Sequence, residues 1–265
     1  MQGTICFSFP YYFKGKKYPL TYGLPAGASS EAHSRARRET IKLFLERKKM
    51  KQISNSEWHR LLNMYVADEE SMRPGLMKPF EQDGYVCSTD THTLIRVDKK
   101  YITDDYTTQL QVPTVSKVIP KPNPTFAITD DGLRKAFSIL GINYDTTTVD
   151  CPECDDECEV EWEYTDRDGD KHTMWGECPC CNGTGKVPNG ADKYCGIGDN
   201  TICSYFMLLL YHVMLSLGVK KVKGTFGNRG QILFQIGDGI DVVVMSYILD
   251  KNSSKPRVPI KATKV

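Results

Sequence analysis

Two pairs of cysteines with the spacing Cys-x-x-Cys limit most tightly how this chain can fold. The first pair is Cys151 and Cys154, and the second, Cys178 and Cys181, follows after 23 further residues. A Cys-x-x-Cys turn directs two thiolates at one metal ion, and two such turns complete the tetrahedral four-sulfur site that Zn²⁺ favours. Because sulfur fills every position, no place is left for a substrate. The spacing therefore predicts one structural, non-catalytic Zn²⁺ ion held by Cys151, Cys154, Cys178 and Cys181.

Other uses of the cysteines also fit the sequence. A redox-active dithiol would have the same spacing, and the nearby Cys158 or Cys180 could replace a nominated ligand. The other cysteines are scattered and are expected to be small buried hydrophobes: Cys6, Cys87, Cys195 and Cys203. The N-terminus lacks the features of a signal peptide, and the apolar run 202–217 is short for a membrane span. These observations argue against a secreted disulfide scaffold and predict a cytoplasmic protein.

The composition excludes a strong overall electrostatic attraction to nucleic acid or anionic lipid. The chain has 265 residues and a formal net charge of +1, and 40% of its residues are hydrophobic and 25% charged, which is ordinary for a globular protein. Any binding driven by charge must therefore come from a local patch.

One such patch is an expected helix from Arg35 to Lys51. Only Glu39 and Glu46 oppose its basic residues, and apolar residues at helical spacing supply an inner face. The basic residues, which we nominate as nucleic-acid-binding, are Arg35, Arg37, Arg38, Lys42, Arg47, Lys48, Lys49 and Lys51. Such a helix can bind phosphates, and a helix that faces only solvent fits the pattern equally well.

Helices and strands are expected in both halves of the chain. A capping box at Ser54 and Glu57 should start a second helix, with Trp58 and Tyr65 in the core. Further helices are expected from Thr129 to 141 and from 200 to 218. β-prone runs lie at 80–97, 160–164, 173–175, 219–226, 231–235 and 240–248.

This order of elements predicts an α+β fold of helix-then-antiparallel-strands units, with a small zinc-bound β-hairpin as an insert. The expected divisions are 1–150 and 189–250 as the two parts of one α+β domain, 151–188 as the four-cysteine hairpin insert, and 251–265 as a flexible tail.

The second cysteine pair lies in the segment CPCCNGTGKV, which resembles the CxxCxGxG repeat of the cysteine-rich domain of DnaJ chaperones. That domain uses four repeats for two zinc ions. This chain has two Cys-x-x-Cys pairs, its first segment, CPECDDEC, lacks the glycines, and the His-Pro-Asp signature of the J-domain is absent. The resemblance therefore implies one zinc ion and does not imply a co-chaperone.

A second resemblance lies in the segment 80–95. Its residues Thr89, Asp90, His92 and Leu94 match the strand–turn–strand of bacterial DNA sliding clamps, the family of the polymerase III β-subunit. Thr91 and Thr93 depart from the Gly and Arg of that turn, and Met245-Ser246 departs from the Met-Pro of the last strand. The resemblance implies basic helices that contact DNA phosphates without reading bases, and a ring that would require homo-oligomers.

Three functions are consistent with these patterns. The first is a non-enzymatic, DNA-associated, sliding-clamp-like protein with a structural zinc module, which would bind double-stranded DNA through backbone phosphates and a replication or other protein partner. The second is a zinc-stabilised protein-interaction module. The third is a metal-dependent nucleic-acid enzyme that would use acidic pairs such as Asp104-Asp105; the sequence contains no nucleophile motif or phosphate-binding glycine loop.

Overall fold

The computed structural model describes residues 4–13, 16–68, 71–247 and 257–265. Its centre is an eight-stranded antiparallel sheet in which helices pack on one face, so the predicted α+β class is confirmed. In spatial order the strands are β17 (Thr263–Lys264), β6 (Phe126–Thr129), β13 (Lys221–Phe226), β14 (Gln231–Gly237), β15 (Ile240–Met245), β5 (Thr93–Asp98), β4 (Tyr85–Thr89) and β3 (Phe80–Gln82).

The main core lies between this sheet and three helices, α2 (Asn55–Asn63), α3 (Asp130–Leu140) and α4 (Ser204–Ser216). The register of β14 and β15 determines which side chains enter this core. Ile232 pairs with Val244 and Phe234 pairs with Val242, so that all four side chains face the helices. Helix α4 contacts α2, α3 and β12 as well as this core. It is therefore apolar almost all round, as a fully enclosed helix should be.

The opposite face of the sheet carries a second, smaller core. Leu233 and Val243, the residues between the inward-facing ones, pack there with Leu76, Phe80 and Leu94. The short 3₁₀ turns η1 (Pro74–Leu76) and η3 (Val115–Lys117) supply part of the cover, and η2 (Lys99–Tyr101) follows β5. Burial on both faces is why these strands read as continuous apolar runs.

A second sheet of three strands corrects two expectations. It contains β11 (Tyr194–Ile197), β12 (Asn200–Cys203) and β16 (Arg257–Pro259). The helix expected from residue 200 begins at Ser204, because 200–203 pair with β11. Residues 257–265, expected to belong to a flexible tail, instead form β16, which runs parallel to β11, and β17, which pairs with β6.

The predicted cap of α2 forms, but the Glu57 side chain, expected to complete the capping box, bonds to Arg60 and Ser216 instead. The side chain of Ser54 accepts a hydrogen bond from the backbone amide of Glu57, as the capping box requires. The Glu57 carboxylate accepts two hydrogen bonds from Arg60 and one from Ser216, and so ties α2 to α4. Trp58 and Tyr65 are buried in the core as predicted.

The hydrogen bonds from Arg60 lower the pKa of Glu57 to about 2, from an ordinary value of 4.5, and Ser216 adds to the shift against the opposing effect of burial. A lowered pKa means that the carboxylate stabilises the fold above pH 4.5 and that this contribution is lost as the pH falls toward 2. We therefore expect Glu57→Gln to lower the free energy of unfolding by about 1 kcal/mol at pH 7 and by almost nothing near pH 2. Urea titrations of both proteins across this range would show it. A loss that did not change with pH would contradict this account.

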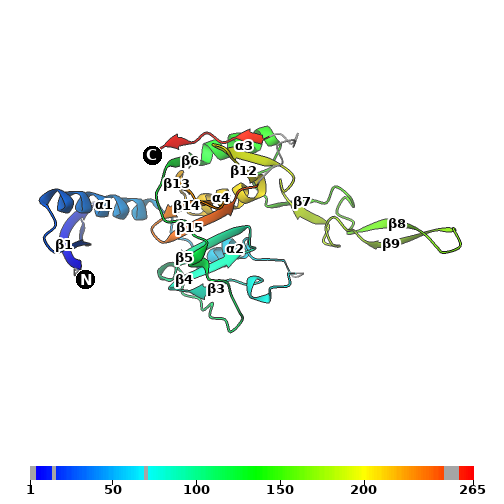
Figure 1. Cartoon of the computed structure of the whole chain (residues 1–265), viewed down its shortest axis with the longest axis horizontal. Coiled ribbons are helices and arrows are strands. Elements are labelled where there is room, and N and C mark those ends of the chain that lie inside the picture. The colour runs from blue at the N-terminus through cyan, green and yellow to red at the C-terminus, as the bar shows by residue number, and fades with distance from the viewer. Residues whose placement is uncertain (1–3, 14–15, 69–70, 248–256) are drawn as a thin grey trace.

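Two extensions leave the body on opposite sides (Figure 1). On one side lie a hairpin of β1 (Thr4–Phe13) and β2 (Lys16–Pro25) and the helix α1 (Ser30–Lys49). Cys6 in this hairpin is exposed, whereas Cys87, Cys195 and Cys203 are buried as expected. On the other side lies the segment 151–188, called the cysteine arm below. Within the described part of the chain, no helix is long and apolar enough to cross a membrane.

Candidate metal centre

The cysteine arm is joined to the body by two short paired strands, β7 (Thr148–Asp150) and β10 (Lys186–Pro188). Between them the chain makes a first turn, the long hairpin of β8 (Glu159–Thr165) and β9 (Lys171–Glu177), and a second turn. A hairpin between the two cysteine pairs was predicted, and the two strands form it with seven residue pairs in register. The buried side chain of Asn189 donates to the carbonyls of Asn143 and Thr146 and so fixes the root of the arm.

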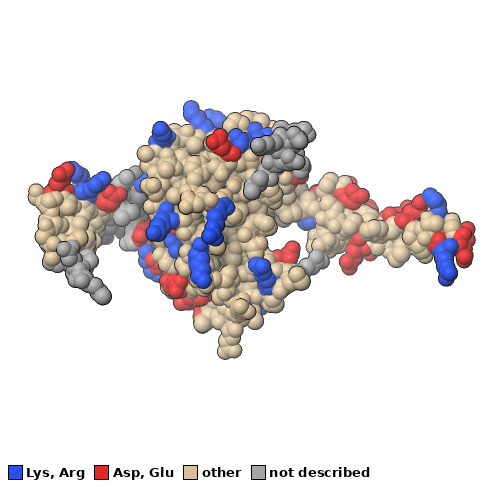
Figure 2. Space-filling view, viewed as in Figure 1, with Lys and Arg blue, Asp and Glu red and all other residues tan. Residues whose placement is uncertain are grey.

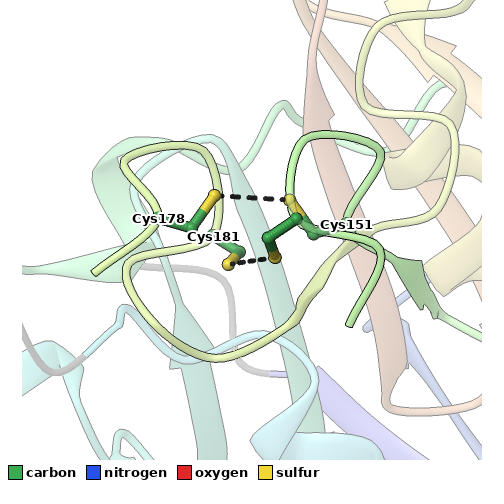
Figure 3. A group of neighbouring side chains, drawn as sticks. Cys151, Cys178 and Cys181 are labelled. Atoms are coloured by element: carbon green, nitrogen blue, oxygen red, sulfur yellow. Dashed lines mark hydrogen bonds between the residues drawn. The ribbon is translucent and has the colours of Figure 1, made fainter. Parts of the chain in front are cut away.

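The four predicted cysteines meet between the two turns (Figure 3). The Sγ atoms of Cys151 and Cys178 are 3.8 Å apart, those of Cys154 and Cys181 are 3.7 Å apart, and all four lie within 4.8 Å of one another. A disulfide would need about 2.05 Å. Four sulfurs placed about 2.3 Å from a central ion in a tetrahedron would be separated by about 3.8 Å. The donor set and its spacing therefore fit a four-coordinate metal ion.

The two turns share the same pattern of positive φ angles. Asp155 and Asn182 have φ angles of 49° and 51°, Asp156 and Gly183 have 74° and 69°, and Cys158 and Gly185 have 68° and 69°. A positive φ strains residues with a side chain and is tolerated by glycine. The first turn, CPECDDEC, thus has the same positive φ positions as the second turn, but without its glycines. An alignment of the two eight-residue segments could have suggested this relation.

Hydrogen bonds between the turns follow the same two-fold pattern. The amide of Cys151 donates to the carbonyl of Gly185, and the amide of Cys178 donates to the carbonyl of Cys158. Within the second turn, the amide of Gly185 donates to the Cys181 sulfur at 3.2 Å. Such N–H···S bonds orient a thiolate and stabilise its charge. Each turn therefore holds the ligands of the other in place.

The surroundings of the cluster favour the ionisation of one thiol, that of Cys151, and oppose the ionisation of Cys154. Burial opposes ionisation of Cys151, but amides of Cys154 and Glu153 donate to its sulfur, and the net effect lowers its pKa to about 6. Burial and hydrogen bonds with the neighbouring sulfurs raise the pKa of Cys154 to about 12. A divalent cation would remove this penalty, so metal binding here should release protons.

The other candidate ligands and acidic sites are not members of this group of four. Cys158 is partly buried, and Cys180 is exposed, although its thiol hydrogen-bonds with the Cys151 sulfur. Among the described residues, the four nominated cysteines are the one group of three or more metal-ligating side chains close enough to share an ion. The acidic pairs have local partners instead: Asp104 accepts from Asn55, and Asp131 pairs with Lys135.

The nominated basic residues lie on and beside α1. Arg35, Arg37 and Arg38 are exposed, and the guanidinium of Arg37 lies 4.6 Å from the centre of the Phe9 ring. Lys51, just after the helix, is exposed too. The side chains of the remaining four lie outside the described part of the chain: Lys42, Arg47, Lys48 and Lys49. The nucleic-acid contact of this helix stays a prediction.

No protein-family model matches the sequence, and no curated protein sequence matches it significantly. Solved structures of bacterial sliding clamps are similar in part. The clamp of Bacillus subtilis shares 11% identity over 76% of this chain at a TM-score of 0.40, and this chain spans 64% of its length. The polymerase III β-subunits of Pseudomonas aeruginosa and Borrelia burgdorferi share 11% identity each, over 91% and 88% of this chain and 74% and 72% of theirs, at TM-scores of 0.40 and 0.41. Function has to be inferred from the chain's own residues.

Proposed function

We propose that this chain is a non-enzymatic, DNA-associated protein of the sliding-clamp type, stabilised by one structural Zn²⁺ ion. The observation that carries the DNA association is the concentration of positive charge in residues 1–51, which contain eleven basic and three acidic residues. The exposed arginines of α1 belong to this segment. Surface cations at this density bind a phosphate backbone irrespective of base sequence.

The arrangement of elements supports the clamp-type part of the proposal. Helix α2 is followed by β3–β5, and helix α4 by β13–β15, and both sets of strands join one antiparallel sheet. These are the helix-then-strands units that the resemblance of segment 80–95 implies. The matched residues have a structural role in the turn, where the Asp90 carboxylate accepts hydrogen bonds from the amides of His92 and Thr93.

The zinc part of the proposal rests on the four sulfurs. Cys151, Cys154, Cys178 and Cys181 would hold the ion, and four thiolates in a buried, closed site suit structural Zn²⁺. The bound ion would supply cross-linking of the two turns and no catalytic chemistry. Without it, the arm has a core of only these sulfurs with Val160 and Val187 against them.

A substitution at Gly185 tests the zinc site, because its amide donates to the Cys181 sulfur and there is no room for a side chain beside it. A Cβ atom there would lie 2.6 Å from a carboxylate oxygen of Asp156 and 3.1 Å from the Cys158 sulfur, at a φ of +69°. Gly185→Ala should therefore displace the amide that donates to Cys181, and we expect a loss in zinc affinity of about 10–100-fold. Competition with a chromophoric chelator would measure it. Gly169→Ala, at a similar φ but in open space at the hairpin tip, is the matched control and should leave the affinity unchanged. Equal affinities for the two variants would contradict the proposed role of this amide.

DNA association is tested by reversing charge beside α1. In fluorescence anisotropy with a labelled duplex, the full zinc-loaded protein should bind with an affinity that falls steeply with salt. The triple variant Arg35→Glu, Arg38→Glu and Lys51→Glu should bind at least tenfold more weakly and reduce the slope of log affinity against log salt by about 2–3. The control variant carries Lys78→Glu, Lys261→Glu and Lys264→Glu, which makes the same change in net charge at exposed positions elsewhere. An equal loss of DNA affinity in both variants, or no DNA binding by the wild type at low salt, would contradict the proposed DNA association.

A further inference from the structure

The hairpin β8–β9 has one apolar face that no part of the described chain covers. Trp162, Tyr164 and Met174 point to the same side, because Trp162 pairs with Met174 and Tyr164 is two residues further along. Their side chains are 44%, 50% and 56% exposed. A two-stranded ribbon gains little stability by itself, and an apolar strip on a projecting element is typical of a contact surface.

The charge of the arm restricts what can cover this face. The cysteine arm contains eleven acidic and three basic residues, a net charge of −8. Glu159, Glu161 and Glu163 alternate with the apolar residues along β8. Figure 2 shows acidic side chains gathered along the arm and basic ones on the visible face of the body. A phosphate backbone would be repelled by this segment, so the surface that covers it must be basic and partly apolar.

The body of the same chain has a groove with this character. The segment 117–125 and the turn between β13 and β14 enclose about 560 Å³. Its lining includes the apolar Val118 and Phe226, which are 47% and 39% exposed, and the exposed cations Lys117, Lys121 and Arg229. None of the described residues that line the groove is acidic.

The groove and the hairpin of one chain are far apart. In Figure 1 the hairpin extends away from the body on the right, whereas β13 and β14 lie in the left half of the body. We infer that the hairpin β8–β9 of one copy docks in the groove between segment 117–125 and the β13–β14 turn of a second copy. Such a contact joins two different surfaces, so a pair of copies keeps one free hairpin and one free groove, to which further copies can add. The inference is independent of the proposed DNA association.

Sedimentation velocity of the full zinc-loaded chain tests this inference. At roughly 100 µM and low salt we expect dimers and larger species, which salt should dissociate because the contact is charge-assisted. The arm variant, Trp162→Ser with Tyr164→Ser, and the groove variant, Lys117→Glu with Arg229→Glu, should each sediment as monomers. Mixed together, they should form a one-to-one dimer that grows no further, because one intact hairpin then meets one intact groove.

Matched controls separate this contact from general effects. Ile139→Ser with Leu215→Ser removes two exposed apolar side chains elsewhere, and Lys78→Glu with Lys261→Glu makes the same charge change as the groove variant. Both controls should self-associate like the wild type. A monomeric wild type at this concentration, or variants that fail to associate when mixed while retaining zinc, would overturn the inference. DNA binding by the arm variant at wild-type strength would leave the proposed function standing in that case.

Discussion

Replacing Cys151 or Cys178 with serine is expected to remove the metal from the protein. Each sulfur lies in a buried cluster with its three partners, and a hydroxyl is a poorer ligand for Zn²⁺ than a thiolate. Four-ligand zinc sites contribute about 10–16 kcal/mol of apparent binding free energy, and we expect the loss of one sulfur to cost about 3 kcal/mol or more, over a hundredfold in affinity. Elemental analysis of the purified protein should fall from one zinc per chain to almost none.

Loss of the ion should unfold the arm and spare the body. The arm has only the four cysteines and two valines as its core, whereas the body has one large and one smaller apolar core of its own. Limited proteolysis should therefore cut the serine variants within 151–188 and leave the remainder intact. Cys180→Ser is the matched control: its exposed thiol hydrogen-bonds with Cys151 but is not one of the four clustered sulfurs, so this variant should keep its zinc. Full zinc content in both Cys151→Ser and Cys178→Ser would mean that the nominated ligands are wrong.

The second large effect, a loss of folding stability, is expected when the ion pair between Arg96 and Asp241 is broken. These residues occupy directly opposite positions on β5 and β15. Two nitrogens of the guanidinium each lie 2.7 Å from the same carboxylate oxygen, and the Asp241 side chain is 8% exposed. Arg96 also lies over the Tyr85 ring at 4.6 Å. Removing one partner of a buried pair leaves an uncompensated charge, so Arg96→Met should lower the free energy of unfolding by about 3–5 kcal/mol at pH 7.

The pH dependence of this loss follows from the carboxylate. Burial raises the pKa of Asp241 even though Arg96 opposes the shift. A raised pKa means that the ionised group opposes folding at neutral pH and that this penalty disappears as the pH falls below the unfolded value. Removing Arg96 should raise the pKa further, so the variant should lose most stability at pH 7 and progressively less toward pH 4.

A double variant provides the control for this prediction. Arg96→Met with Asp241→Leu removes both charges, and apolar replacements of a buried pair are often close to neutral. Urea denaturation of the wild type, both single variants and the double variant gives the coupling between the two residues. A double variant as unstable as Arg96→Met alone would show that the loss comes from packing and not from the unpaired charge.

Several elements were predictable because their signals are local. The cap at Ser54, the hairpin between the cysteine pairs and the end of α3 at Gly141, with φ +64°, depend on residues within a few positions of one another. The strand Asn200–Cys203 was taken for the start of a helix because its residues continue an apolar run. It is a strand because it pairs with β11 across a two-residue turn, and β11 is held on its other side by β16, more than 50 residues away in sequence.

By itself, the sequence determined the four candidate ligands, the basic segment and the α+β order of elements, since spacing, charge and periodicity are properties of nearby residues. The tertiary structure alone decided which distant groups meet. It placed Asp241 beside Arg96, 145 residues away, and Ser216 beside Glu57, 159 residues away. It also gave the turn at Cys154 the same positive φ angles as the glycine-containing turn at Cys181. Such contacts arise from pairing across the fold, where long-range packing outweighs the preferences of each local segment.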